Sequence, residues 1–354
     1  MSEIEEEKKN IVREAREIVR DLVIPNAFIY WFDFLFHISL GWFSFFLCCK
    51  AEFFSPVQGV FFFISIFSFY RSAIFIHEIT HLRKGTFRLF RFAWNLLCGF
   101  PLMIPSFLYQ GVHNDHHNVK LYGRDGDGEY FPFVHKGRGK IILFILASFF
   151  VPAFFFLRFV FLTPLSYCSK SLRSFVLEKI SSFSIDLNYQ RTRSSLNTVA
   201  MWQAQEFAAC LYGWIFIFLM LKGVVPYKVF GLWLITFGVV FFLNSLRTLA
   251  AHCYRHSGDE VLDISEQLLD SVNIPNSFLG VLWAPVGLRF HATHHLIPEM
   301  PYHSLGKTHQ RLREQFSEKN LYTQTSSNGL LSTLARLWKE SGNFVLFVLF
   351  VGCF

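Results

Sequence analysis

The sequence predicts an all-α integral membrane protein with four spanning helices arranged in two hairpins. Of its 354 residues, 52% are hydrophobic and only 17% are charged, whereas an ordinary soluble domain carries about 25% charged residues. Four apolar runs, at 27–48, 57–76, 206–221 and 229–247, approach the roughly 20 residues that a helix needs to cross a bilayer. The short connector within each pair contains Pro or Gly, which favours a tight turn outside the membrane.

Both ends of the chain are expected to lie outside the spanning region. Residues 1–25 are mostly charged and lack the apolar core and cleavage site of a signal peptide, so they predict an amphipathic cytosolic helix. Residues 26–315 are expected to form one membrane domain, followed by a C-terminal tail at 316–354. The apolar end of this tail, from about Asn343, is too short to span and predicts an interfacial anchor.

The formal net charge of +7 does not indicate a nucleic-acid partner. The Lys and Arg residues cluster beside the apolar runs, as they do on the cytosolic side of membrane proteins, where lipid headgroups are the nearest anions. The seven Cys residues show no CxxC spacing, which predicts reduced, structural thiols. The expected location is therefore a membrane crossed several times, with the basic segments facing the cytosol.

Two further apolar runs, 92–109 and 141–163, are interrupted by Pro101, Pro105 and Pro152. Proline inside a helix removes a backbone hydrogen bond and kinks or breaks the helix. If either run crossed the membrane, the histidine-rich segments described next would lie on opposite sides and could not share a site. We therefore expect re-entrant or interfacial helices here and a cytosolic, histidine-rich cap.

The histidines concentrate in three segments, HEITH at 77–81, HNDHH at 113–117 and HATHH at 291–295. Residues i and i+3 or i+4 share one face of a helix, so each segment can turn two imidazoles toward one ion. The candidate ligands are His77, His81, His113, His116, His117, His291, His294 and His295. Eight imidazoles exceed the four ligands of a tetrahedral zinc, which predicts two metal ions. Imidazole suits iron, zinc and copper alike, so the pattern does not select the metal.

These three histidine boxes resemble those of the membrane fatty acid desaturase family and its hydroxylase relatives, over about residues 25–315. The resemblance is most specific in HNDHHNVKLYGRDGDGEYFPF and LRFHATHHLIPEMPYHSLGKTHQRL, which look like the second and third boxes of bacterial acyl-lipid-type desaturases. It implies a di-iron centre, with two Fe ions held by the eight boxed histidines and O2 as the co-substrate.

The resemblance also implies a ninth histidine ligand near the end of the last spanning helix, where His252 stands. His256, expected one turn further along the same helix, is an alternative or a supporting residue, and Asn244 is a looser candidate. Glu78 and Asp115 are expected to orient metal-bound imidazoles, as carboxylates commonly do. Asp115 could instead cap a helix.

The remaining polar residues in the apolar and Gly-rich segments have simpler expectations. His37 and Asp33, four residues apart in the first spanning run, are expected to hydrogen-bond to each other. The run GRDGDGEY at 123–130 lacks the twelve-residue calcium-loop pattern and predicts a surface turn. Three further histidines are expected to cap loops or face solvent: His135, His303 and His309.

The resemblance implies O2-dependent desaturation of a long-chain fatty acyl group carried by a lipid, by CoA or by a carrier protein. An unactivated C–H bond offers no acidity to a base, so an oxidant made from O2 is needed and two electrons must arrive from outside. The sequence shows neither a haem-binding HPGG segment nor a ferredoxin-like Cys cluster. We therefore expect a separate electron donor of the ferredoxin, flavodoxin or cytochrome b5 type.

Three kinds of alternative remain open at this stage. Related di-iron lipid hydroxylases and carotenoid ketolases use similar boxes. The HExxH spacing at 77–81 is also a zinc protease signature, with Glu78 as the general base, although the two HxxHH segments have no role in a protease. A non-catalytic lipid-binding protein is the alternative outside enzymes.

Overall fold

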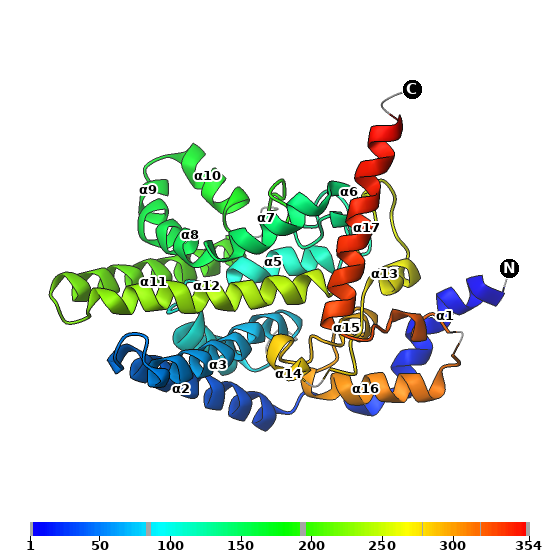
Figure 1. The fold of residues 1–354 in the computed structure, drawn as a ribbon, viewed down its shortest axis with the longest axis horizontal. Helices are drawn as coiled ribbons and strands as arrows, with labels where there is room; N and C mark the ends of the chain where they lie inside the picture. Colours follow the sequence, from blue (N-terminus) through cyan, green and yellow to red (C-terminus); the bar gives the residue numbers. More distant parts are fainter. Residues whose placement is uncertain (1–2, 83–85, 192–195, 278, 319, 352–354) are drawn as a thin grey trace. The chain divides into compact units, whose positions relative to one another are not determined.

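The computed structural model describes residues 3–82, 86–191, 196–277, 279–318 and 320–351 (Figure 1). Within these ranges the chain is helical and contains isolated β-bridges but no named strand. The all-α membrane fold predicted from the sequence is confirmed. The chain divides into two compact units, which are described separately. The membrane unit comprises residues 27–113 and 146–243, and the terminal unit comprises residues 1–26, 114–145 and 244–354.

The helices of the membrane unit include the long apolar elements. They are α2 (Ala27–Lys50), α3 (Pro56–His81), α4 (Arg88–Trp94), η2 (Asn95–Gly99), α8 (Val151–Leu157), η3 (Arg158–Leu162), α9 (Thr163–Ser166), α10 (Lys170–Lys179) and α11 (Leu196–Leu221). Three helices continue from one unit into the other: α5 (Phe107–His116), α7 (Arg138–Ser148) and α12 (Tyr227–Leu249).

The terminal unit is built from shorter, more polar helices and one long helix at its C-terminal end. Its elements are α1 (Glu3–Ile18), η1 (Arg20–Leu22), α6 (Phe133–Lys136), α13 (Ile264–Asp270), α14 (Gly280–Trp283), α15 (His291–Leu296), α16 (Tyr302–Gln315), η4 (Thr323–Thr325) and α17 (Leu330–Val351).

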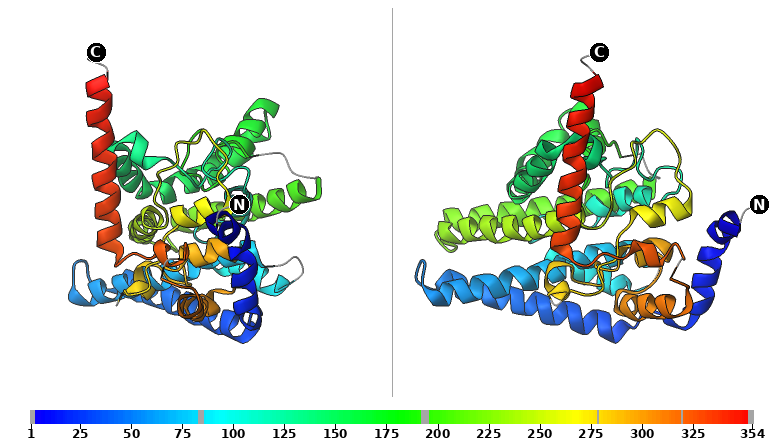
Figure 2. Two further views of the ribbon diagram at one scale, coloured as in Figure 1. Left: turned by 90° about the vertical axis from the view of Figure 1, so that its right-hand side faces the viewer. Right: turned by 45° about the vertical axis from the view of Figure 1, so that its right-hand side comes forward.

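Four helices in the described ranges are long and apolar enough to cross a membrane: α2, α3, residues 198–221 of α11, and α12. Figures 1 and 2 show α2 beside α3 and α11 beside α12, so both predicted hairpins are confirmed. The first turn is defined by Ser55, whose Oγ accepts a hydrogen bond from the Gln58 backbone N–H, and by Pro56 at the first helical position. A capping hydroxyl followed by proline is a typical start for a helix.

Aromatic side chains pack the two hairpins of the membrane unit together. The ring centroids of Trp42 and Phe69 are 4.8 Å apart, and those of Phe69 and Phe237 are 5.0 Å apart. Phe69 on α3 thus contacts both α2 and α12. Large apolar side chains on the outer faces, including Phe28 and Phe32, are exposed, as expected for residues that face lipid rather than water.

The first hairpin also contains a half-buried ion pair. Asp33 accepts hydrogen bonds from His37 Nδ1 and from the guanidinium of Arg71, at distances of 2.8 and 2.7 Å. The predicted contact between His37 and Asp33 is confirmed, and Arg71 is a third member that the sequence did not indicate. Charged groups at this depth are costly unless they are paired, so the pairing lets α2 and α3 carry them.

Neither of the two interrupted apolar runs forms one straight helix. In the first run, α4 continues into the π-helical turn η2, and the chain then breaks before α5. In the second run, α7 and the helical stretch from Val151 to Ser166 are bent by 58°. Pro152 occupies the first turn of α8, where a missing N–H costs no intrahelical hydrogen bond. A bend of this kind is compatible with a broken span and with a re-entrant pair alike, so the sidedness of this segment stays a prediction.

A more deeply buried ion cluster connects the middle of the chain to α11. Arg158 is fully buried, and its guanidinium lies 2.7 Å from the Glu206 carboxylate; Arg173 lies 2.5 Å from the other oxygen of Glu206. Two cations around one buried anion are stable only when the geometry and the other hydrogen bonds are favourable. Thr163 and Ser181 accept further hydrogen bonds from the two terminal nitrogens of Arg158. The cluster thereby anchors η3 and α10 to a spanning helix.

Helix α1 begins the terminal unit; Ile11 and Ala15 on it are buried, as is Val19 just after its end. The cytosolic placement of residues 1–25 stays a prediction. The tail prediction needs correction, because the apolar end is not a separate short anchor. It continues α17, a single helix over Leu330–Val351 that is visible in Figure 1 and packs against α6. Side chains beyond Gly342 and residues 352–354 lie outside the described part of the chain.

Candidate metal centre

Three histidines of the membrane unit come together between α3 and α5. His77 and His81 lie one turn apart at the C-terminal end of α3, and His113 lies on α5. The three ring-centroid separations are 4.9 Å for His77 and His81, 4.6 Å for His77 and His113, and 4.8 Å for His81 and His113. The Nε2 atoms of His81 and His113 are 2.7 Å apart. The i, i+4 spacing therefore turns two imidazoles of one helix toward a third.

Glu78 lies buried beside this set. Its Oε2 accepts a hydrogen bond of 2.5 Å from the Tyr30 hydroxyl, and its Oε1 is 3.6 Å from His77 Nδ1. The second distance exceeds that of a normal hydrogen bond, so the firm partner of Glu78 is Tyr30 on α2. Glu78 is thus adjacent to a candidate ligand, as expected for an orienting carboxylate, and its role stays a prediction.

Four histidines of the terminal unit form a second set. They are His116 on α5, His252, and His291 and His295 on α15, and each offers one ring nitrogen within 4.8 Å of the others. His291 Nε2 lies 2.9 Å from His252 Nε2 and 3.1 Å from His295 Nε2. The four imidazoles therefore converge on a common point from three segments that are distant in the sequence.

His117 and His294 face each other within the same unit. Their Nε2 atoms are 3.0 Å apart and their ring centroids 4.8 Å. His294 is buried, whereas His117 is half-buried. His117 follows His116 in the chain, and His294 precedes His295, so the two adjacent histidines of each HxxHH segment are divided between the four-histidine set and this pair.

A carboxylate that the sequence analysis assigned to a surface turn orients His116. Asp127 is buried, and its two carboxylate oxygens lie 2.9 and 3.1 Å from His116 Nδ1. The same carboxylate accepts the backbone N–H groups of Gly123 and Glu129. The turn at 123–130 is present, but its surface placement was wrong for Asp127. With Nδ1 held by the carboxylate, the Nε2 of His116 is available to a metal.

Tyr122 and Asp270 orient His252 in a similar way. The Tyr122 hydroxyl donates to Asp270 Oδ2 at 2.9 Å and lies 2.9 Å from His252 Nδ1. Both residues are buried. Sequence reasoning missed both, since neither is part of a histidine box and Asp270 is the last residue of α13, a helix that the sequence did not single out.

The structure gives His252 and His256 different surroundings. The last spanning helix, α12, ends at Leu249, so the two histidines do not continue it one turn apart as expected. Both lie in the irregular segment that follows, where Tyr254 has a φ of +58°. His252 joins the four-histidine set. His256 instead packs on Gly123, where an added Cβ would lie 2.6 Å from its Cδ2, and its backbone N–H donates to Tyr130.

The two remaining candidates for the site have other surroundings. Asn244 lies on α12 and accepts hydrogen bonds from Arg247 at 3.1 and 3.3 Å, and it belongs to neither histidine set. Asp115 lies in the last turn of α5. A helix N-cap precedes the first turn, so the capping alternative for Asp115 is wrong for this helix.

Of the three histidines expected at loops or in solvent, two match and one does not. His135 contacts the Arg255 carbonyl at 2.7 Å, and His303 accepts the Asn26 backbone N–H at 3.1 Å, as loop caps do. His309 is buried, at 4% exposure. Its pKa is lowered to about 4, first by burial and then by Arg313 and Arg289.

The electrostatics of the four-histidine set suit a metal ion. Burial lowers the pKa of His252 and of His291 well below its usual range, and neighbouring histidines lower both further. Burial also acts to lower the pKa of His116, but the Asp127 carboxylate outweighs it, and the net shift is upward. The Nε2 atoms of His252 and His295 lie 2.9 and 3.1 Å from His291 Nε2, and a cation at this point would satisfy all three nitrogens. The donor set is all nitrogen, which iron, zinc and copper accept.

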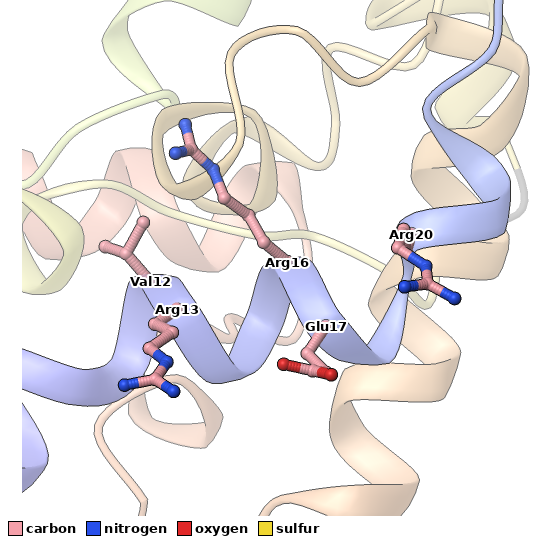
Figure 3. A pocket seen from close by; sticks show the side chains of 5 residues that line it. All are labelled: Val12, Arg13, Arg16, Glu17 and Arg20. Atoms are coloured by element: carbon pink, nitrogen blue, oxygen red, sulfur yellow. The ribbon is translucent and has the colours of Figure 1, made fainter.

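The hollow shown in Figure 3 lies elsewhere, on α1 and η1. Its lining residues are Val12, Arg13, Arg16, Glu17 and Arg20. No histidine lines it, and one of its arginines, Arg16, pairs with Glu299 at 3.1 Å. This hollow therefore contributes no candidate metal ligand.

An all-α membrane protein with three histidine boxes and convergent imidazoles defines a class of metal-dependent membrane enzymes. A family model described as fatty acid desaturase matches residues 53–327, which include all three boxes. A curated protein described as a ceramide hydroxylase, from Caulobacter vibrioides (strain NA1000 / CB15N), is 38% identical over 332 residues. The alignment covers 94% of this chain and 94% of that protein. No solved structure matches the chain.

The chain belongs to the fatty acid desaturase family, because the family model covers most of its length. It is a multi-pass membrane enzyme of the desaturase and hydroxylase superfamily, whose members are oxidoreductases that act on lipids. The family predicted from the three histidine boxes is confirmed. Desaturation, which the boxes also predicted, is not established by a relative that is described as a hydroxylase.

Proposed function

We propose that this chain is an O2-dependent di-iron hydroxylase that acts on a ceramide. The observation that carries the proposal is the 38% identity to a ceramide hydroxylase across 94% of both chains. Similarity of this extent reaches far beyond the three boxes, which hydroxylases and desaturases share. Desaturation of a long-chain acyl group is the second candidate, favoured by the match to the fatty acid desaturase family.

The proposed metal centre uses nine histidines. One iron is held by the four-histidine set of the terminal unit, His116, His252, His291 and His295. The other iron is assigned to the remaining five boxed histidines, as the family resemblance implies: His77, His81, His113, His117 and His294.

The chemistry accounts for the need for O2 and for electrons. Two reduced irons bound at these histidines would supply the reduction of O2 to an oxidant that can attack an unactivated C–H bond. Hydroxylation places one oxygen atom in the C–H bond and releases the other as water, consuming two electrons and two protons. Desaturation removes two hydrogens from neighbouring carbons and, with the same electrons and protons, releases both oxygen atoms as water.

The protein itself holds the metal-binding histidines in position and shields them from water. Asp127 and Tyr122 hold the Nδ1 sides of His116 and His252, so their Nε2 atoms point into the set without reorganisation. Burial of His116, His252 and His291 excludes water from this set. An oxidant that attacks C–H bonds must be kept from solvent and from wrong bonds.

The product distinguishes the two candidate reactions. Expression of the chain in a host that contains ceramides should convert them to species with one additional oxygen atom and unchanged unsaturation. Lipid mass spectrometry with fragmentation measures this directly, and the host expressing a His117→Ala variant is the matched control. Ceramides or fatty acids that lose two hydrogens instead would assign the chain as a desaturase.

The proposed reaction also needs an electron donor and a defined side of the membrane for the active site. Two electrons per turnover come from a separate donor of the ferredoxin, flavodoxin or cytochrome b5 type, and the active site faces the cytosol, where such donors are found. Exposed cations of the terminal unit, such as Lys120, Lys136 and Lys140, support both points, since they favour an acidic partner and the cytosolic side.

Cysteine labelling tests the orientation. In a background with Cys168→Ser and Cys353→Ser, new cysteines at Lys120 and Lys307 should react with a membrane-impermeant maleimide only after the cells are lysed. Both residues are exposed, whereas position 83 is outside the described residues and Met300 is buried. A cysteine at Lys222, in the connector between α11 and α12, should react in intact cells. Labelling of position 120 in intact cells would contradict the proposed topology.

A further inference from the structure

A chain of hydrogen bonds lies buried behind the third histidine box in the terminal unit. Thr293, between the box histidines on α15, places its Oγ1 3.2 Å from Asn273 Oδ1 and 2.6 Å from the Tyr322 hydroxyl. The Tyr322 hydroxyl lies 2.8 Å from His309 Nδ1. Asn273, Thr293 and Tyr322 have no exposed surface, and His309 is 4% exposed.

The number of available hydrogen atoms fixes the direction of donation along this series of hydrogen bonds. Thr293 donates its single hydroxyl hydrogen to Asn273 Oδ1, because an amide oxygen can only accept. Tyr322 must then donate to Thr293, and His309 must donate to Tyr322 through an N–H at Nδ1. A neutral histidine can carry that hydrogen at Nδ1. Each link therefore depends on the one before it, from His309 to Asn273.

Asn273 is the point at which three segments meet. Its backbone forms β-bridges to Phe290, which precedes the box, and to Ser326 near the end of η4. Two residues earlier, Ser271 bridges to His252. The position of Asn273 thus links the segment of the ninth histidine to the segment that leads into the third box.

The side chain of Asn273 also caps the box helix. The N-cap position of α15 is Phe290, which has no capping atom, while Asn273 Oδ1 accepts the Thr293 backbone N–H at 3.0 Å. A helix of six residues has little stability of its own and four unpaired N–H groups at its start. The orientation of α15 therefore depends on hydrogen bonds that come from outside the helix.

We propose that Asn273, Thr293, Tyr322 and His309 are positioning residues that hold His252 and the histidines of α15 in the arrangement needed for metal binding. None of the four belongs to a candidate ligand set. They act through the backbone bridge at Ser271 and through the cap on α15. The inference rests on the proposed metal centre and adds to it the residues that keep its ligands in place.

The test compares iron retention in variants that keep side-chain volume. Thr293→Val removes the central hydroxyl, Tyr322→Phe removes the next one, and Thr293→Ser retains a hydroxyl at the same place. We expect the valine and phenylalanine variants to release iron to a ferrous chelator about 10-fold to 100-fold faster than the wild type, in the range seen when a ligand's supporting partner is lost. Thr293→Ser should release iron at nearly the wild-type rate.

Thr333→Val is the matched control. Thr333 is equally buried, and its hydroxyl makes two hydrogen bonds, to the Gly329 carbonyl and to Ser327 Oγ, so this variant loses a comparable buried hydroxyl on α17. A purely structural role predicts the same iron release from Thr333→Val and Thr293→Val, and that result would overturn the inference. So would an unchanged release rate in both Thr293→Val and Tyr322→Phe.

The iron content of the wild-type protein distinguishes a failure of the proposed metal centre from a failure of the positioning role alone. A wild-type protein that purifies without two irons overturns the proposed metal centre and this inference with it. A wild-type protein with two irons, whose Thr293→Val variant releases them no faster, overturns the positioning role alone. Thermal unfolding of the metal-free variants, followed by circular dichroism, confirms that each one is folded at the temperature of the release assay.

Discussion

Replacing His117 or His294 by Ala is expected to abolish activity and to lower the iron content of the purified protein from about two per chain. The two Nε2 atoms are 3.0 Å apart, so each residue loses its counterpart when the other is removed. Each histidine is one of very few ligands to its metal, and nothing else in the pair can replace it. Elemental analysis of protein purified without oxygen, together with the product assay, measures both effects.

The membrane fold should survive these substitutions. Contacts such as those of Phe69 with Trp42 and Phe237 hold the spanning helices together, and helix packing in a membrane does not need the histidines. His135→Ala is the control, because His135 contacts a backbone carbonyl and belongs to neither set; it should retain two irons and full activity. Full activity in His117→Ala or His294→Ala would contradict the ligand assignment. One zinc per chain in place of two irons would favour the protease alternative.

The hairpins and the histidine boxes were predictable because both follow from local sequence. An apolar run of about 20 residues needs no distant partner to indicate a spanning helix. Likewise, an i, i+4 pair such as His77 and His81 shares a helix face wherever that helix packs. The bend between α7 and α8 was also foreshadowed, although Pro152 begins the second helix instead of breaking one.

The end of α12 was not predictable from local sequence. Residues 247–256, RTLAAHCYRH, include neither Gly nor Pro to stop a helix. The helix ends because the chain finds other backbone partners: the Cys253 N–H donates to the Asp270 carbonyl, and the Val272 N–H donates to the Ala251 carbonyl. Such pairing between segments about 20 residues apart overrides helix propensity, and it is what turns His252 into the four-histidine set.

The buried polar partners of the ligands were also beyond reach of the sequence. Asp127 stands in a Gly-rich turn that looks like any exposed loop, yet it is buried because His116 and two backbone N–H groups satisfy its carboxylate. His309 lies on an otherwise polar helix and is buried by contact with Tyr322 and Phe290. Burial of a polar group depends on partners that only the folded chain supplies.

The second large effect is expected at the ninth ligand, because His252 and His256 have different surroundings in the structure. His252 Nε2 lies 2.9 Å from His291 Nε2, and its Nδ1 is held by Tyr122. His256 is absent from both histidine sets and packs against the turn at Gly123. From their positions in the sequence both residues were candidates for the ninth metal ligand, whereas these contacts favour His252.

His252→Ala is therefore expected to lose iron and activity together, whereas His256→Ala should keep its iron and lose at most about 10-fold in activity, the lower end of the effect of a residue outside the ligand set. The physical reason is that removing His252 leaves three imidazoles for one ion and deprives Tyr122 and Asp270 of the group they orient. His252→Gln retains a polar side chain without an imidazole, so its failure to restore iron would show that the ring nitrogen is required. Iron content and ceramide conversion should be measured for all three variants at equal expression in the membrane. If His256→Ala loses the iron and His252→Ala retains it, the ninth ligand is His256, and the segment after Leu249 must adopt a different path from the one described here.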